Sequence, residues 1–176
     1  KKIKNTLINT TNKTTINSTT NQQRNNTLSH RKATLDDLVR IVDLMHDDEL
    51  GQTRENTGNI SKQKYINAFH VIDQDPNQYL MVVEESSQII GTCHLTLMPS
   101  LTFTGSTRLN IEAVRIEKNN RSKNIGQWMI EQAVAYGKTK GATIIQLTTD
   151  KKRTRAKRFY HKMGFTDSHE GMKKHV

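Results

Sequence analysis

The stretch Val114-Arg115-Ile116-Glu117-Lys118-Asn119-Asn120-Arg121-Ser122-Lys123-Asn124-Ile125-Gly126 decides the fold of this chain of 176 residues. An apolar run ends at Ile116, a polar and basic run follows, and apolar residues return at helical spacing from Ile125. This pattern predicts a strand, a short loop and a helix. The first turn of a helix has unpaired backbone N–H groups and a partial positive charge, so the junction is a candidate anion site. Arg121 and Lys123 add mobile charge, and Gly126 lets a ligand approach the backbone. The alternative is an ordinary loop with exposed charges.

The segments after this junction predict a crossover unit. The expected elements are a helix over residues 125–140 ended by Gly141, a buried strand over 142–148, a helix over 151–163 ended by Gly164, and one or two edge strands from Phe165. Because a strand, a helix and a second strand follow one another, we expect the two strands to be parallel.

The segments before the junction predict an antiparallel sheet with two helices. We expect a strand over residues 28–33, a helix capped by Thr34 and ending near 46–50, a helix capped by Ser61, strands over 79–85 and 88–97 joined by a tight turn at Ser86-Ser87, a loop over 99–105, and a strand over 108–116. The order predicts one α/β (α+β) domain with a mixed sheet.

Residues 1–27 are rich in Asn, Thr and Lys and show no sustained period, which predicts a disordered tail. A basic arm for nucleic acid, or an address peptide, is the alternative for this tail. The tail has a net charge of +5. Residues 28–114 carry seven basic and twelve acidic residues, and residues 115–176 carry fifteen basic and five acidic residues. A basic half suits a polyanionic ligand and an acidic half a cationic one, although an uneven solvated surface would give the same counts.

Composition excludes several classes of protein. The one cysteine, Cys93, permits no internal disulfide, and its apolar neighbours favour a small core residue over a nucleophile. No apolar stretch approaches the ~20 residues that cross a bilayer, and the first residues lack the apolar core of a secretory signal. We therefore expect a cytoplasmic protein without a membrane partner. The seven histidines show no metal-ligand spacing, so we expect no metal.

Four motifs in order resemble the GNAT superfamily of N-acetyltransferases. They are Arg121-Ser122-Lys123-Asn124-Ile125-Gly126 at the start of the central helix, Ala156-Lys157-Arg158-Phe159-Tyr160-His161-Lys162-Met163-Gly164-Phe165, the start Arg31-Lys32-Ala33-Thr34-Leu35-Asp36-Asp37, and Ile90-Gly91-Thr92. The resemblance covers residues 28–176, with 1–27 as a separate tail. Ile111-Glu112-Ala113-Val114-Arg115 and Ser168-His169-Glu170-Gly171-Met172-Lys173 look like a subgroup of small bacterial-type members.

The resemblance implies a mixed, mostly antiparallel sheet with helices on both faces, and transfer of an acetyl group from acetyl-CoA to a primary amine. It assigns acetyl-CoA binding to Val114, Ile116, Arg121, Ser122, Lys123, Asn124, Ile125, Gly126 and Arg153. Two positions depart from the family pattern. Asn124 stands where the family usually has Gly, and Asn is the next-best residue for a left-handed backbone. Arg153 stands where many members have an Asn facing the cofactor.

The resemblance also implies the catalytic groups. An amine with a pKa of about 10.4 must lose a proton before it attacks a thioester, and Glu112 could accept that proton through water. Tyr160 matches the position whose hydroxyl protonates the leaving thiolate. A backbone N–H near Val114 or Ile116 would polarise the carbonyl. The alternatives are a charge on the solvent face of the sheet for Glu112 and a packed core residue for Tyr160.

The resemblance implies a small-molecule or peptide amine as the acceptor. The acidic residues Asp47, Asp48 and Glu49 follow the first helix, a region that covers the acceptor cleft in the family; a solvated helix end is the alternative. A homodimer could form through the last strand. Two rival functions stay open: a GNAT module that binds CoA without catalysis, and a basic nucleic-acid-binding protein. Sparse aromatic residues in the basic stretches argue against nucleic acid.

Overall fold

The computed structural model describes residues 28–47, 52 and 59–176, so the expected tail 1–27 lies outside the described residues. Its centre is a sheet of five strands in the order β1-β2-β3-β4-β5. The strands are β1 (Leu28–Lys32), β2 (Gln78–Glu85), β3 (Gln88–Pro99), β4 (Thr107–Ile116) and β5 (Ala142–Leu147). Neighbouring strands are antiparallel except β4 and β5, which are parallel. The predicted antiparallel sheet followed by a crossover is confirmed.

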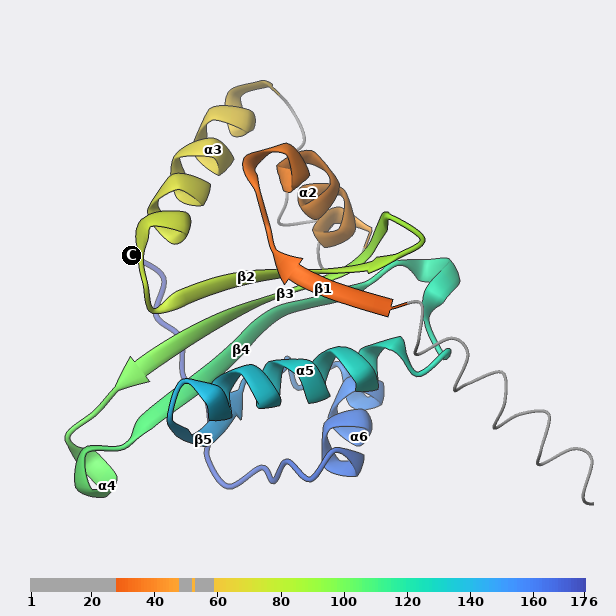
Figure 1. The fold of residues 1–176 in the computed structure, drawn as a ribbon. Coiled ribbons are helices and arrows are strands. Elements are labelled where there is room, and N and C mark those ends of the chain that lie inside the picture. Colours follow the sequence, from red (N-terminus) through yellow and green to blue (C-terminus); the bar gives the residue numbers. More distant parts are fainter. Residues whose placement is uncertain (1–27, 48–51, 53–58) are drawn as a thin grey trace, which may run out of the picture.

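Helices cover both faces of the sheet (Figure 1). The turn η1 (Leu35–Asp37) leads into α2 (Leu38–His46), which lies with α3 (Asn59–Gln74) on one face. The other face carries α5 (Ile125–Thr139) and α6 (Thr154–Lys162), and the connections hold the short α4 (Thr102–Gly105) and η2 (Lys118–Asn120). This arrangement confirms the predicted mixed sheet between two helical layers.

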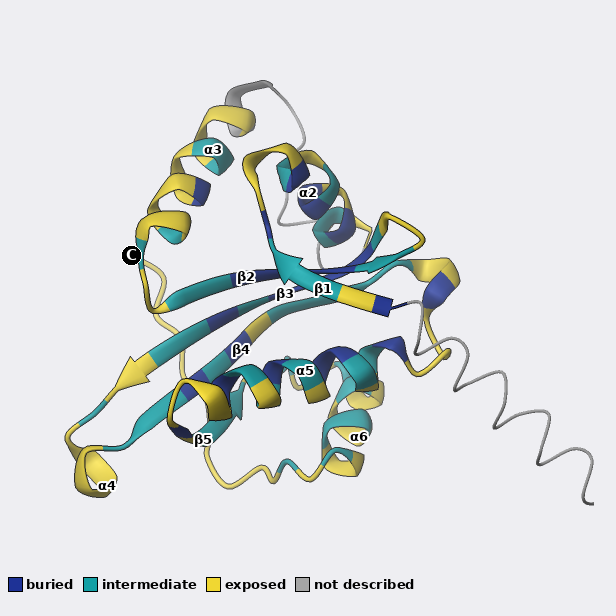
Figure 2. Cartoon of the chain, in the orientation of Figure 1, coloured by how far each residue is buried: buried dark blue, intermediate teal, exposed yellow. Residues whose placement is uncertain are grey.

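Alternation along the strands builds two separate cores. Met81 and Val83 of β2 belong to the larger core, which includes Met129 of α5. Leu80 and Val82 point the other way and join the smaller core under α2 and α3. Figure 2 shows the result on α5, whose sheet-facing side is buried and whose outer side is exposed.

Three predicted boundaries were wrong. No strand follows α6, because residues 166–174 are polar, carry no alternation and lie exposed; Asp167 instead pairs with Lys157 at 2.7 Å. β5 is therefore an edge of the described sheet. Helix α6 starts three residues later than expected, since Asp150 accepts hydrogen bonds from the backbone N–H groups of Lys152 and Arg153 and forms a turn there. Helix α3 begins at Asn59, so Ser61 lies inside it.

The start of the first helix is stabilised by a buried carboxylate. Asp37 accepts hydrogen bonds from the backbone N–H of Thr34 at 2.7 Å and from both terminal nitrogens of Arg31 at 2.6 and 3.0 Å. Arg31 also donates to Glu84 on β2. The Arg31 guanidinium and the Thr34 hydrogen bonds lower the pKa of Asp37 to about 2 despite its burial. The network joins β1, η1 and β2.

Asp37→Asn should lower the free energy of unfolding at pH 7 by about 1–2 kcal/mol, since the Arg31 partner is partly exposed. A carboxyl with a lowered folded-state pKa stabilises the protein above its unfolded pKa. The contribution is therefore complete above about pH 4 and is lost as the pH falls towards 2. Urea unfolding of both proteins between pH 7 and pH 3 measures this difference. Asp73→Asn is the control, because its pair with Lys32 is exposed; equal losses for the two variants would contradict the prediction.

Candidate functional site

The candidate site lies where β4 loses its second neighbour. β4 pairs with β5 only as far as Ile111, which lies opposite Leu147. β3 accompanies β4 further, to the pairing of Gly91 with Ile116. Residues 112–116 thus form an open edge of β4 on the side of β5, within the described part of the chain.

A β-bulge separates the paired and open parts of β4. His94 lies opposite Glu112 and Thr92 opposite Arg115, so Ala113 and Val114 together oppose Cys93. Ala113 has a φ of 50°, in the left-handed region that residues with a side chain rarely adopt. Bulges bend a strand and increase its twist, which accounts for the divergence of β4 from β5 at this point.

The backbone of the open edge is accessible to a ligand. The carbonyl of Val114 accepts a hydrogen bond from Arg115 Nη1 at 2.8 Å, and that of Ile116 accepts one from Arg121 Nε at 2.9 Å. Both carbonyls therefore pair with side chains where a strand would have supplied backbone partners. The N–H and the C=O of one residue point the same way in a strand, so the Val114 and Ile116 amides face this edge too.

The open edge leads directly to the start of α5. The last part of the connection, residues 121–124, is exposed along its whole length and is called the 121–124 loop below. Asn124, the N-cap, has φ 63° and ψ 5°, and no side chain caps the first turn. The left-handed backbone expected from Asn at this position is confirmed. Ser122 is left-handed as well (φ 64°), which its sequence did not indicate.

The first turn of α5 has room beside its backbone. A Cβ placed on Gly126 would lie 3.7 Å from Phe159 Cζ and 3.9 Å from Ile116 Cγ1, both ordinary contacts. The protein itself does not require glycine there, so the space left by the missing side chain is free for a ligand. The uncapped N–H groups, the helix dipole and this space together suit the binding of an anion.

The basic side chains of the 121–124 loop contact acceptors on the protein. Arg121 binds the Ile116 carbonyl and approaches Asp47, with 3.9 Å between Nη2 and Oδ2. Lys123 donates to Asn120 Oδ1 at 3.1 Å. Both cations of this loop therefore have acceptors within the protein. Arg155 reaches the loop from α6 and donates to Ser122 Oγ at 2.8 Å.

Tyr160 lies on α6 beside the larger core. Its ring packs edge-on against Phe159 and Phe165, with centroids 5.3 and 5.9 Å away. Burial raises the pKa of the Tyr160 phenol, while the charges of Arg115 and Arg153 oppose this rise. The hydroxyl is consequently protonated at neutral pH and can act as a donor.

Glu112 lies on the other face of the sheet. Leu80, His94 and Glu112 are cross-strand neighbours on β2, β3 and β4, and Leu80 belongs to the core under α2 and α3. The Glu112 side chain is 55% exposed, and its Oε1 lies 3.5 Å from His94 Nδ1. Asn110 Nδ2 lies 3.4 Å from the other oxygen, Oε2. Since burial lowers the pKa of His94, against a smaller raising effect of Glu112, the imidazole is neutral at pH 7.

Tyr160 and Glu112 therefore approach from opposite faces. Two groups on opposite faces of a sheet can act on one molecule only where the sheet is interrupted. The separation of β4 from β5 after Ile111 provides this interruption.

The acidic cluster is described only in part. Asp48 and Glu49 lie outside the described residues, and Asp47 is exposed at the end of α2, facing Arg121. Sequence reasoning missed His94, which contacts Glu112, and Asn120, which contacts Lys123. It also missed Arg40 and Glu117, which reach Asn120 through hydrogen bonds. The contact between His94 and Glu112 could not be predicted from the sequence, because the bulge determines which residue of β4 lies opposite His94. Asn120 could not be identified either, because a polar residue in a loop gives no sign in the sequence of whether it is buried.

The structure also bears on the cysteine, on metal-binding groups and on membrane-spanning helices. Cys93 is fully buried, and burial raises the pKa of its thiol to about 12, so its expected role as a core residue is confirmed. Among the described residues, no three His, Cys, Asp or Glu side chains are placed to share a metal ion. In the same residues, no helix combines the length and hydrophobicity that crossing a bilayer requires.

Comparison with solved structures supports the fold. A transcriptional regulator from Bacillus halodurans C-125 is 40% identical, with a TM-score of 0.81 over 85% of this chain and 99% of that one. Glucosamine-6-phosphate N-acetyltransferase from Arabidopsis thaliana is 23% identical (TM-score 0.68, 85% and 98% of the two chains). A predicted acetyltransferase from Clostridium acetobutylicum, solved with acetyl-CoA, is 21% identical (TM-score 0.67, 84% and 96%). The latter two likenesses concern the fold alone.

No curated protein matches the chain. The sequence model described as the acetyltransferase (GNAT) family matches residues 41–165, which include the bulge, the 121–124 loop and Tyr160. This match covers most of the chain, and the mixed sheet agrees with it. The chain therefore belongs to the GNAT family of acetyltransferases.

Proposed function

We propose that this protein transfers an acetyl group from acetyl-CoA to a primary amine. The observation that carries the proposal is that the open edge of β4 ends beside the uncapped first turn of α5. An extended chain with amide groups fits the open strand edge, and a diphosphate fits the helix start. In acetyl-CoA the pantetheine arm and the pyrophosphate follow one another in the same order.

Charges around the path support the same ligand. Six of the eight residues 151–158 are basic, and Arg155 from this segment contacts the 121–124 loop. Arg153 precedes α6, and its positive charge lowers the pKa of the Tyr160 phenol against the effect of burial. We assign the phosphates of acetyl-CoA to the first turn of α5 and to this basic segment, and the pantetheine amides to Val114 and Ile116.

The chemistry needs one base and one acid. Bound acetyl-CoA supplies an activated thioester carbonyl. Glu112 accepts a proton from the amine through water, the amine nitrogen then bonds to the carbonyl carbon, and the carbon–sulfur bond breaks. Tyr160 donates its phenolic proton to the sulfur, and the phenolate recovers a proton from the nitrogen through water. The N–H of Val114 or Ile116 polarises the carbonyl oxygen.

The acceptor carries a cationic amine in this proposal. Glu112 is exposed on the face of α2 and α3, and Asp47 lies at the end of α2. Both carboxylates attract an ammonium group, whether it belongs to a small molecule or to a peptide. An acetyl-transfer screen over a panel of amines, reading the released CoA thiol, would identify the acceptor.

Acetyl-CoA should raise the melting temperature of the chain, because a ligand that binds only the folded state stabilises it. Residues 28–176 should show the same rise as the full chain. Differential scanning fluorimetry with acetyl-CoA up to millimolar concentration measures it. Absence of a rise would refute the assignment, and tight binding of random DNA with steep salt dependence would favour the nucleic-acid alternative.

Tyr160→Phe should lower kcat about 10²-fold while leaving the Kd of acetyl-CoA within about threefold, since only the proton donor is lost. Tyr136→Phe is the matched control, because this half-buried tyrosine stacks on Tyr79 instead. Steady-state kinetics and calorimetry give the two quantities. Equal losses of turnover and binding would make Tyr160 a packing residue.

Glu112→Gln should lower kcat by a similar factor without weakening acetyl-CoA binding, because the amide cannot accept the amine proton. The loss should shrink as the pH rises towards the pKa of the amine, where the substrate is already deprotonated. Glu131→Gln, on the exposed side of α5, is the control. An unchanged pH–rate profile in Glu112→Gln would assign this carboxylate to the sheet surface only.

A catalytically silent module that binds CoA is the second candidate. Asn124, in place of the family's usual glycine, favours it only if its side chain obstructs the pyrophosphate. The left-handed backbone at this position is already formed with Asn, so the loop conformation does not favour this candidate.

A further inference from the structure

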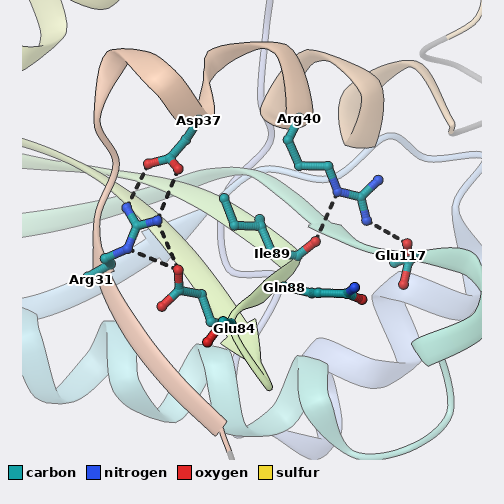
Figure 3. A pocket seen from close by; sticks show the side chains of 8 residues that line it. Arg31, Asp37, Arg40, Glu84, Gln88, Ile89 and Glu117 are labelled. Atoms are coloured by element: carbon teal, nitrogen blue, oxygen red, sulfur yellow. Dashed lines mark hydrogen bonds and ion pairs between the residues drawn. The ribbon is translucent and has the colours of Figure 1, made fainter.

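A polar hollow of about 450 Å³ lies between β1, the start of the first helix, the β2–β3 hairpin and Glu117. Figure 3 shows two separate ion-pair groups on its wall. The first joins Arg31 to Asp37 and Glu84; the second joins Arg40 of α2 to Glu117, the residue after β4. The first group stabilises the helix start described above. The second contacts the segment that precedes the 121–124 loop.

Arg40 fixes the position of the Glu117 carboxylate. Its Nε donates to the Ile89 carbonyl at 2.9 Å, and its Nη2 donates to Glu117 Oε1. The guanidinium is planar, so these two hydrogen bonds define its orientation. The backbone N–H of Glu117 also donates to the Ile90 carbonyl at 2.8 Å. The backbone of Glu117 is thereby attached to the start of β3 directly, and its side chain is attached there through Arg40.

The second oxygen of Glu117 continues the chain of hydrogen bonds towards the loop. Asn120 Nδ2 donates to Glu117 Oε2 at 2.7 Å, and Asn120 Oδ1 accepts from Lys123 Nζ at 3.1 Å. Asn120 is buried. Its amide can adopt only this orientation, because the flipped amide would place its NH₂ group against the Lys123 ammonium. Lys123 lies between Ser122 and Asn124, the two left-handed residues of the loop.

We propose that Glu117 is a positioning residue: oriented by Arg40, it sets the conformation of the 121–124 loop through Asn120 and Lys123, and so prepares the first turn of α5 for a diphosphate. The inference rests on the proposed function. A loop ordered before binding costs no ordering entropy when the ligand arrives, which increases affinity. Helix α2 thereby contributes to acetyl-CoA binding without contacting acetyl-CoA.

Glu117→Gln tests this role with little change of shape. The introduced amide can still accept from Arg40 through its oxygen, but its NH₂ group then faces Asn120 Nδ2, and two donors oppose each other. Asn120 must flip and lose Lys123. Glu84→Gln is the matched control, since Glu84 is a carboxylate of the same hollow that pairs with Arg31 and not with the loop.

Calorimetry should show the Kd of acetyl-CoA rising about tenfold in Glu117→Gln and by less than about twofold in Glu84→Gln, the rise corresponding to one charge-assisted hydrogen bond. Both variants should melt somewhat earlier than the wild type. At saturating acetyl-CoA, kcat of Glu117→Gln should stay within about threefold of the wild type. Equal affinity of Glu117→Gln and wild type, or an equal loss in Glu84→Gln, would overturn the proposal.

Amide hydrogen exchange of residues 121–126 without ligand provides a second measurement. Exchange should accelerate in Glu117→Gln and not in Glu84→Gln. Failure of the wild type to bind acetyl-CoA would refute the proposed function. Hydrogen exchange would then still test whether Glu117 orders the 121–124 loop. Unchanged exchange in Glu117→Gln would overturn the positioning role.

Discussion

β4 keeps β3 as a partner to its end but loses β5 after Ile111, and the rest of the site depends on this loss. Backbone N–H and C=O groups require partners, so an unpaired edge in a sheet is an incomplete structure that a ligand can complete. The bulge at Ala113 determines where the edge opens. In the proposed mechanism, the same interruption lets Tyr160 and Glu112 reach the two reactants from opposite faces of the sheet.

The charge division along the chain corresponds to a division of chemical roles. The basic second half contains the 121–124 loop and the segment before α6, where the phosphates are proposed to bind. The acidic first half contributes Glu112 and Asp47, where the ammonium is proposed to bind. The opposite charges also interact, since Arg121 from the second half lies 3.9 Å from Asp47 of the first. Ionic contacts between the halves therefore form part of the site itself.

Periodicity and turn residues predicted most of the elements, because the alternation in β2 and the helical spacing in α5 are local signals. The left-handed backbone at Asn124 could be predicted because few residue types tolerate it. The expected strand from Phe165 did not form, since most of the residues after it are polar. The acceptors of Arg121 and Lys123 could not be predicted, since they belong to other elements of the structure. The contact between Arg40 and Glu117 joins residues 77 positions apart, and that between His94 and Glu112 depends on the register change at the bulge. No local pattern encodes either contact.

Cys93 has a practical consequence. It is the single cysteine of the chain, it lies opposite the bulge within the larger core, and its thiol has a pKa of about 12. Thiol reagents attack thiolates, so the folded protein contributes almost no background to an assay that titrates free thiols. A cysteine introduced on the surface, for example in the 121–124 loop, would be the one group to react with a fluorescent maleimide. The chain is therefore suited to site-specific labelling without removal of its natural cysteine.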